Sequence, residues 1–459
     1  MLRAFHHPWM KVYKPKIVLI AMTMLRRGRL ILIVLATLAA ATPAQTVLTL
    51  ADCLRLAEAA PNDVRVADQE RRIADRELTQ ARAGFKPQAE AQTNFIYNKP
   101  SASDRNNPGF VTLNGVREYV LLGQVVQEFD TSGRLRADYQ RARAAQGAAG
   151  AEYEITRRDL RRAVTTAYYR LLLTRHLAAV LRDAVQESRA FEQRTKLLFD
   201  NGEAAQADVV KAAALAASFE QARSAAELEA SLANQELAAF WSKDVVDELA
   251  LADTLTAQPP APEAAPEATP TAAPTGVPSV NAPYLQRAEF KLFDWQRRGL
   301  EAEVKRARSA LLPEFKFIFQ YGLDATALRF SEHGYAAYFN LRIPIFDWFR
   351  TRSQVEQFKL RGEQVETRRA IAERGFARDY QQALTRVKRL FEQLKLTQEQ
   401  IRLAEEDLRL SRVRYEGGEG AALDVVTAQS QLAQARGNYY TVLANYLNAR
   451  ADLEVASGQ

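Results

Sequence analysis

The chain has 459 residues, of which 47% are apolar and 25% are charged, and it contains four histidines and one cysteine. This composition excludes a disulfide framework, a CxxC pair and a histidine-rich metal site. The net charge of +7 comes from residues 1–44, which hold seven basic and no acidic residues; the other 55 basic and 55 acidic residues cancel, so nucleic-acid binding has no compositional support.

Residues 1–44 are expected to form an N-terminal extension and a secretory signal. Arg26-Arg27-Gly28-Arg29 precedes an apolar run over 30–41, and Thr42-Pro43-Ala44 supplies the small residues of a cleavage site. The apolar run has about 12 residues, whereas a spanning helix needs roughly 20. Export is therefore favoured, with an uncleaved anchor as the alternative, and Met1, Met22 and Met24 are all possible starts.

Residues 45–257 are expected to form a first repeat. Its elements, in order, are a helix, strands at about 87–99 and 117–130, a long helix over 131–199, a tight turn at 200–208 and a helix to 240. No proline occurs from 109 to 258, and residues 164, 167, 171, 174 and 178, all apolar except Thr174, recur at the spacing of a coiled coil. The second strand is apolar on both faces, so its facing stays ambiguous.

A proline-rich segment at 258–280 separates this repeat from a second one over 281–459. Seven of the 17 prolines lie in the segment, which is expected to be an extended linker. The second repeat contains a helix, strands at about 313–323 and 335–347, a long helix over 348–415, a tight turn at 416–424 and a helix to 456.

Three matched motifs indicate an internal two-fold repeat. They are Ala81 to Pro87 with Ala307 to Pro313, Phe129-Asp130 with Phe346-Asp347, and Asn201-Gly202-Glu203 with Gly417-Gly418-Glu419. Their offsets drift only from 226 to 216, as differences in loop length would produce.

The strands of the second repeat alternate apolar and polar residues. The apolar positions are Phe315, Phe317, Phe319 and Tyr321 in one strand, and Phe339 and Leu341 in the next. Segments of about ten residues with this pattern in an exported chain favour a transmembrane β-barrel, although a soluble half-buried sheet shares the pattern. Four strands cannot close a barrel alone, because single-chain barrels need about eight or more. Three copies, giving twelve strands, are the simplest solution.

In the order of these motifs the chain resembles the TolC-type outer-membrane factors, the outer membrane efflux proteins. The resemblance covers nearly everything from Leu48 to Gly458. It implies an α+β membrane protein: a trimeric twelve-strand barrel in the outer membrane of a Gram-negative-type cell, continuous with a coiled-coil helical tunnel in the periplasm. It also implies passive transport, with a periplasmic adaptor and an inner-membrane pump as partners, and no catalytic residue, cofactor or metal.

The residues of interest are at the tight turns. Gly202 and Gly418, with Glu203 and Glu419, are expected to form the periplasmic tips that contact the adaptor. By resemblance, Asp208, Asp424 and Tyr415 lie at the gate, although each aspartate is equally explained as a helix-start residue. The chain departs from the family pattern at Gly420, where an arginine tie is expected, and at Thr427, where a second acid is expected.

Two other classes of protein are kept as alternatives. The first is an exported coiled-coil structural or cell-envelope protein without channel activity, which would need no alternating aromatic strands. The second is a periplasmic adaptor, for which a duplicated hairpin with four strands is a poor fit. An exported enzyme comes last, because no catalytic constellation is present.

Overall fold

The computed structural model describes residues 47–97, 117–245, 248–253, 255, 282–329, 331 and 333–458. The expected leader (1–44) and the expected linker (258–280) lie outside these ranges. One small unit holds residues 47–48 and 249–252, joined by a parallel bridge between Leu48 and Leu251. Every helix and strand described below belongs to the other, larger unit.

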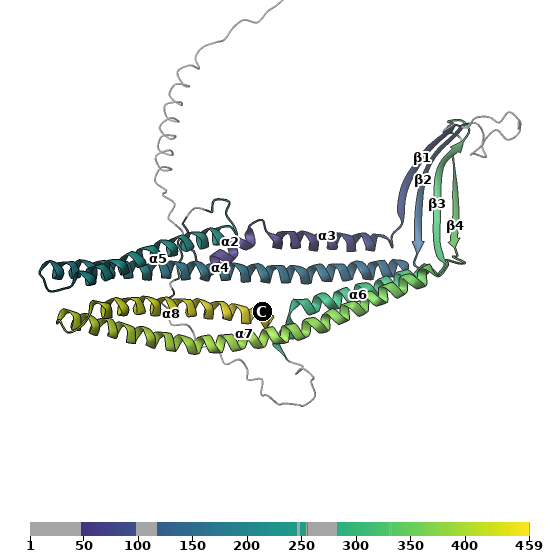
Figure 1. Cartoon of the computed structure of the whole chain (residues 1–459). Coiled ribbons are helices and arrows are strands. Elements are labelled where there is room, and N and C mark those ends of the chain that lie inside the picture. Colours follow the sequence, from purple (N-terminus) through teal and green to yellow (C-terminus); the bar gives the residue numbers. More distant parts are fainter. Residues whose placement is uncertain are drawn as a thin grey trace, which may run out of the picture. The chain divides into compact units, whose positions relative to one another are not determined.

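The larger unit is mostly helical, and α4 and α7 extend along its length (Figure 1). Its helices are α2 (Leu50–Ala59), α3 (Asp63–Ala83), α4 (Arg134–Asp200), α5 (Gln206–Ala238), the 3-10 turn η1 (Pro283–Gln286), α6 (Ala288–Ser309), α7 (Arg350–Glu416) and α8 (Ala422–Ala456). With 67 residues each, α4 and α7 are about 100 Å long. No helix in the described ranges combines the length and the apolar character needed to span a bilayer.

Contacts between the helices define a row. Near the turns, α5 packs on α4, α4 on α8 and α8 on α7; nearer the sheet, α3 packs on α4, α4 on α6 and α6 on α7. Along α4 the packed seam is buried at Val164, Ala167, Leu171, Ala178 and Val185, the spacing of a coiled coil. The row therefore ends in α7 on one side and in α3 and α5 on the other.

The four strands form one antiparallel sheet in the order β1 (Gln88–Tyr97), β2 (Arg117–Phe129), β3 (Glu314–Ala325) and β4 (His333–Arg342). Phe129 is opposite Phe315, which is opposite Leu341. Odd-numbered residues of all four strands therefore share one face, because side chains alternate along a strand. This register settles the facing of β2 and leaves β1 and β4 as edge strands.

The two Phe-Asp motifs mark the passage from strand to long helix. Asp130 accepts hydrogen bonds from the backbone N–H groups of Leu135 (2.9 Å) and Arg136 (3.2 Å). Asp347 accepts them from Phe349 (3.1 Å) and Thr351 (2.9 Å), and hydrogen bonding from Thr351 lowers the pKa of Asp347. Each aspartate thus caps a helix start whose N–H groups have no partner in the helix itself.

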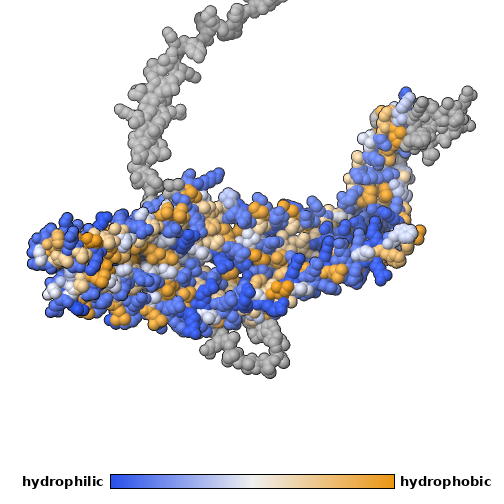
Figure 2. Space-filling model, in the orientation of Figure 1, coloured by the Kyte–Doolittle hydropathy of each residue, from blue (hydrophilic) through white to orange (hydrophobic). Residues whose placement is uncertain are grey.

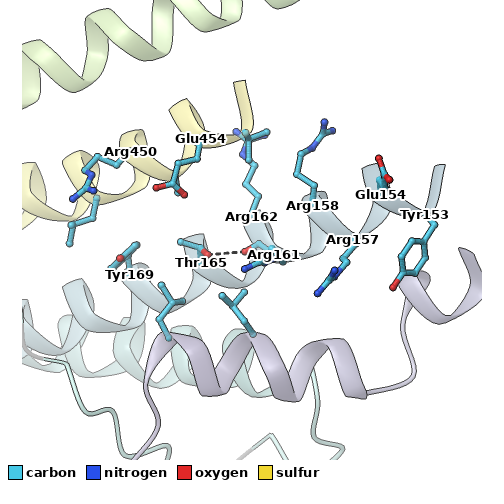
Figure 3. A pocket seen from close by; sticks show the side chains of 15 residues that line it. Tyr153, Glu154, Arg157, Arg158, Arg161, Arg162, Thr165, Tyr169, Arg450 and Glu454 are labelled. Atoms are coloured by element: carbon cyan, nitrogen blue, oxygen red, sulfur yellow. Dashed lines mark hydrogen bonds between the residues drawn. The ribbon is translucent and has the colours of Figure 1, made fainter. Parts of the chain in front are cut away.

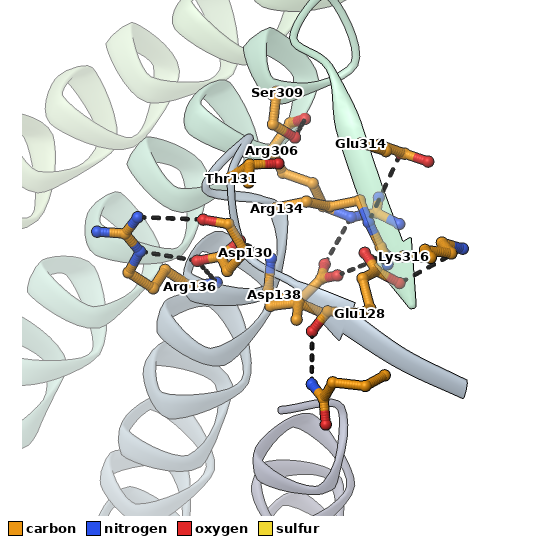
Figure 4. Close-up of polar contacts among 12 residues, drawn as sticks. Glu128, Asp130, Thr131, Arg134, Arg136, Asp138, Arg306, Ser309, Glu314 and Lys316 are labelled. Carbon is orange, nitrogen blue, oxygen red and sulfur yellow. Dashed lines mark hydrogen bonds and ion pairs between the residues drawn. The ribbon is translucent and has the colours of Figure 1, made fainter. Parts of the chain in front are cut away.

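A charged cluster joins the base of the sheet to the helices (Figure 4). Arg134 lies among Glu128, Asp138 and Glu314, and Lys316 lies 3.5 Å from Glu128. Figure 2 shows hydrophilic residues gathered in this region and apolar patches on the strands. The ion pairs connect β2 and β3 to the start of α4.

The contact of α6 with α4 depends on one glycine. A Cβ built on Gly147 would lie 2.3 Å from ring atoms of Trp295, whereas one built on Gly150 would meet nothing within 4 Å. We expect Gly147→Ala to destabilise the protein by about 1–3 kcal/mol through overpacking. Gly150→Ala, the matched control on the same helix, should stabilise it by up to about 1 kcal/mol. Urea unfolding of both variants, followed by circular dichroism in detergent, measures the difference; equal stabilities would contradict the close packing.

Candidate functional site

Both tight turns have the same hydrogen-bonded geometry. Gly202 and Gly418 have φ angles of +83° and +76°, which favour glycine. The N–H of Glu203 donates to the carbonyl of Leu198 (2.8 Å), and that of Glu419 to the carbonyl of Arg414 (2.9 Å). This six-residue closure is a Schellman motif, which satisfies carbonyls at a helix end and reverses the chain. Glu203 and Glu419 are exposed at the two tips.

The two expected gate aspartates lie in the first turns of α5 and α8. Asp208 forms an ion pair with Lys211 (3.6 Å), and the carboxylate of Asp424 accepts a hydrogen bond from the N–H of Ala421 (3.3 Å). These contacts suit helix starts. They place one aspartate in each hairpin of the chain, and a role for either in a gate stays a prediction.

Tyr415 is positioned at the end of α7. Its ring packs edge-on against Phe191 of α4, with 5.3 Å between centroids, and contacts a core that includes Ala212, Leu408 and Val425. Its hydroxyl is enclosed and has no hydrogen-bond partner within the described part of the chain. Tyr415 therefore helps to hold the α7–α8 hairpin against the α4–α5 hairpin.

Two ion pairs that we did not predict connect the hairpins. Arg412 of α7 lies 3.1 Å from Glu187 of α4, and Arg194 of α4 lies 3.3 Å from Glu416 of α7. They line a groove of about 610 Å³ with Tyr415 on its wall. We call them the α4–α7 ion pairs. Glu187 and Arg194 are seven residues apart, so the sequence places both on the same side of α4, beside the coiled-coil seam. Their partners lie more than 200 positions away in the sequence and could not be inferred from it.

A second groove, of about 510 Å³, lies between α2, α4 and α8 (Figure 3). Five arginines line it: Arg157, Arg158, Arg161, Arg162 and Arg450. Arg157 pairs with Glu58 (3.0 Å), Arg158 with Glu289 (2.9 Å) and Arg162 with Asp452 (2.8 Å). The arginines mainly link helices, and their charges are largely compensated inside the chain.

Glu289 shows how strongly this region is tied together. Burial alone would raise the pKa of its carboxyl, but hydrogen bonds from Arg287 and Arg158 lower that pKa to about 2. A group with a lowered pKa contributes stability above its unfolded pKa and loses it only as the pH falls through the folded value. The Glu289 contacts are therefore retained throughout the neutral and mildly acidic range.

The two faces of the sheet differ in chemistry. On the odd-numbered face Phe315 and Phe317 both pack against Phe339, with centroids 5.3 and 5.1 Å apart. On the other face Gln320 donates to Gln124 (2.9 Å), which donates to Glu90, so a polar row crosses three strands. Phe319, Tyr321 and Leu341 are exposed on the aromatic face; contact of this face with lipid stays a prediction. No group of three potential metal ligands occurs among the residues that the structure describes.

The chain matches the model of the outer membrane efflux protein family over residues 53–242 and 281–459. The chain therefore belongs to this family, which consists of channels rather than enzymes, and the TolC-type resemblance is confirmed. No curated protein matched it in sequence.

Solved structures of outer-membrane channels share the fold. The Campylobacter jejuni CmeC outer membrane channel matches with a TM-score of 0.76 and 17% identity, over 89% of this chain and 85% of that one. Vibrio cholerae VceC matches with a TM-score of 0.74 and 18% identity, over 89% and 96%. The open state of Neisseria gonorrhoeae MtrE matches with a TM-score of 0.74 and 19% identity, over 89% and 88%.

Proposed function

We propose that the protein is the outer-membrane exit duct of a tripartite efflux or type I secretion system. Three copies would form a twelve-strand barrel in the outer membrane and a helical tunnel in the periplasm. Cargo would pass through passively, because the sequence contains no P-loop. An inner-membrane pump would drive transport, and a periplasmic adaptor would meet the tips at Gly202, Gly418, Glu203 and Glu419.

The sheet is the observation that carries this proposal. It has an aromatic face and a polar face in continuous register over four strands, and among the described strands β1 and β4 each pair on one side only. In a bilayer an open edge would leave backbone groups without hydrogen bonds, so the edges must pair. Joining β4 of one copy to β1 of the next would close a barrel with the aromatic face toward lipid and the Gln124–Gln320 row toward the lumen.

The helices support the same closure. On α7 the side chains of Leu396, Leu403 and Leu410 repeat every seven residues and are 70%, 54% and 46% exposed. At the other end of the helix row, α5 exposes Val210 and Leu228. A heptad of exposed leucines indicates a missing helical partner. Pairing of α7 with α5 of the next copy would lie on the same interface as pairing of β4 with β1. A single head-to-tail interface would then close the ring.

Reconstitution tests the function. The protein folded in detergent should have the mass of a trimer by light scattering, and in planar bilayers it should conduct ions. A coiled-coil structural protein without channel activity would stay soluble without detergent and conduct nothing. A stable folded monomer would contradict the shared barrel.

The α4–α7 ion pairs predict how the tips open. In the double variant Glu187→Gln/Glu416→Gln we expect more frequent opening, since each exposed pair contributes about 0.2–1 kcal/mol and three copies add together. The control is Glu399→Gln/Glu406→Gln, whose pairs with Arg402 and Arg409 lie within α7. The open fraction in planar bilayers, recorded at low and high salt, measures the effect. An equal rise in both double variants would show that the link between hairpins is not what matters.

A further inference from the structure

The passage from β4 to α7 exposes an unusual number of large apolar side chains. Ile345 is 95% exposed, Phe346 61%, Trp348 83% and Phe349 64%. The rings of Phe346 and Trp348 meet edge-on with 4.9 Å between centroids, and Phe349 adjoins Phe346 at 6.0 Å. The aromatic residues thus form an exposed cluster, which we call the junction cluster (Phe346, Trp348 and Phe349).

The backbone of the junction cluster is strained. Trp348 and Phe349 have φ angles of 56° and 63° and are the only non-glycine residues with positive φ in the described ranges. A left-handed conformation is unfavourable for a residue with a side chain, because its Cβ comes too close to the following carbonyl oxygen. At the start of α4 the corresponding cap is Gly133, with φ of 75° and Ser132 before it. The chain therefore has a relaxed solution at one junction and a strained aromatic one at the other, the kind of outlier that points to a function.

The position of the junction cluster can be compared with the thickness of a membrane. Apolar and aromatic rows cross the sheet at Phe129–Phe315–Leu341 and, ten positions along β2, at Tyr119 beside Phe95. Ten residues of strand tilted by roughly 40° rise about 26 Å, close to the band of about 25 Å that barrels present to lipid. The junction cluster follows β4 just beyond the first row, on the side of the helices.

We propose that the junction cluster inserts into the headgroup region of the periplasmic leaflet and sets the depth of the barrel. The proposal rests on the proposed function, in which the sheet spans the outer membrane. Trp prefers the boundary between acyl chains and headgroups. Arg350 and Arg352 follow directly and are exposed, so their charges complement lipid phosphates. Between Leu341 of the aromatic face and the junction cluster, Ile343 and Ile345 are also exposed, by 58% and 95%. A run of exposed apolar side chains therefore leads from the aromatic face to the junction cluster, and lipid is the partner that fits it.

Depth-dependent fluorescence quenching tests the proposal. The chain has four tryptophans, and replacing Trp9, Trp241 and Trp295 with phenylalanine leaves Trp348 alone. The trimer is reconstituted in phosphatidylethanolamine/phosphatidylglycerol vesicles containing phosphatidylcholine brominated either near the headgroup or near the chain end. We expect Trp348 to lose emission with the shallow bromine and to keep it with the deep one. The difference between wild type and Trp348→Phe gives the same quantity if the triple replacement lowers the yield.

A second tryptophan separates the two proposals. Phe319→Trp, in a background with no other tryptophan, reports the predicted lipid face near the middle of the band, opposite Val125 and Ala337, and should be quenched by the deep bromine. Quenching at 319 without quenching at 348 would overturn the junction proposal and leave the duct intact; Trp348 would then pack against a neighbouring copy. Absence of quenching at both positions would contradict both the membrane-spanning barrel and the insertion of the junction cluster.

The first junction supplies the matched graft. Trp348→Ser/Phe349→Gly gives the second junction the residues of Ser132 and Gly133, and the glycine relieves backbone strain. We expect the helical content to be unchanged and the yield of trimer inserted into vesicles to fall several-fold. Unchanged insertion would mean that the junction cluster does not anchor the protein.

Discussion

Phe319→Arg is expected to prevent or strongly reduce insertion of the barrel. Phe319 lies on the aromatic face opposite Val125 and Ala337, near the middle of the apolar band, and is 38% exposed in the single chain. An arginine facing lipid near the bilayer midplane costs about 2–4 kcal/mol. In a trimer the substitution occurs three times. The fraction of protein that forms trimers in vesicles, measured at several lipid-to-protein ratios, should fall accordingly.

The neighbouring residue provides the control for that experiment. Gln320→Arg places the same charge on the opposite face, where Gln320 donates a hydrogen bond to Gln124. Losing one such bond costs about 0.5–1.5 kcal/mol, and the charge would lie in water. Insertion should therefore be reduced far less than by Phe319→Arg. Equal defects in the two variants would contradict the predicted facing.

How far the sequence predicts this fold depends on how local each signal is. The alternation from Phe315 to Tyr321 predicts the aromatic face of β3, because polar residues along one side of a single strand are enough to tell its two faces apart. In β2 the residues on both sides are apolar, and only pairing with β3, nearly 200 residues away, shows which side Phe129 and Val125 share with Phe315 and Phe319. Register is a tertiary property that alternation alone does not specify.

The same distinction applies to the candidate site. The turns at Gly202 and Gly418 could be predicted from the sequence, because a helix end that reverses the chain needs a residue with left-handed backbone. Both glycines have positive φ angles. The α4–α7 ion pairs and the contact of Trp295 with Gly147 depend on which helices lie together. The left-handed Trp348 and Phe349 contradict local preference altogether, so sequence rules would place glycine there. Departures of this kind are expected at functional sites.

The structure shows why the family's arginine tie would be crowded at Gly420. A Cβ at Gly420 would lie 3.1 Å from both the Cβ of Arg414 and the backbone nitrogen of Tyr415, and the N–H of Gly420 donates to the carbonyl of Arg414. An arginine introduced there would require the end of α7 to shift by a few tenths of an ångström. The contacts that the structure does show near the turns are the α4–α7 ion pairs, and the predicted gate is best tested through Asp208 and Asp424.

Asp208→Asn/Asp424→Asn is expected to weaken the cation preference of the channel without unfolding it. If three copies bring six carboxylates to the entrance, their field attracts cations, as acidic rings do in other pores. Asparagine also suits a helix start, so the first turns of α5 and α8 should persist. The ratio of cation to anion permeability, from reversal potentials across a salt gradient in planar bilayers, should fall toward unity.

Two controls accompany that measurement. Asp407→Asn removes a carboxylate from an exposed position on α7 away from the turns and should leave the permeability ratio unchanged. Glu203→Gln/Glu419→Gln removes the exposed tip charges and shows whether the field comes from the turns in general or from the two aspartates. If the double asparagine variant keeps its full cation preference, Asp208 and Asp424 serve only as helix-start residues and have no role in the gate. Asp208 would then pair with Lys211, and Asp424 would cap its own helix through Ala421.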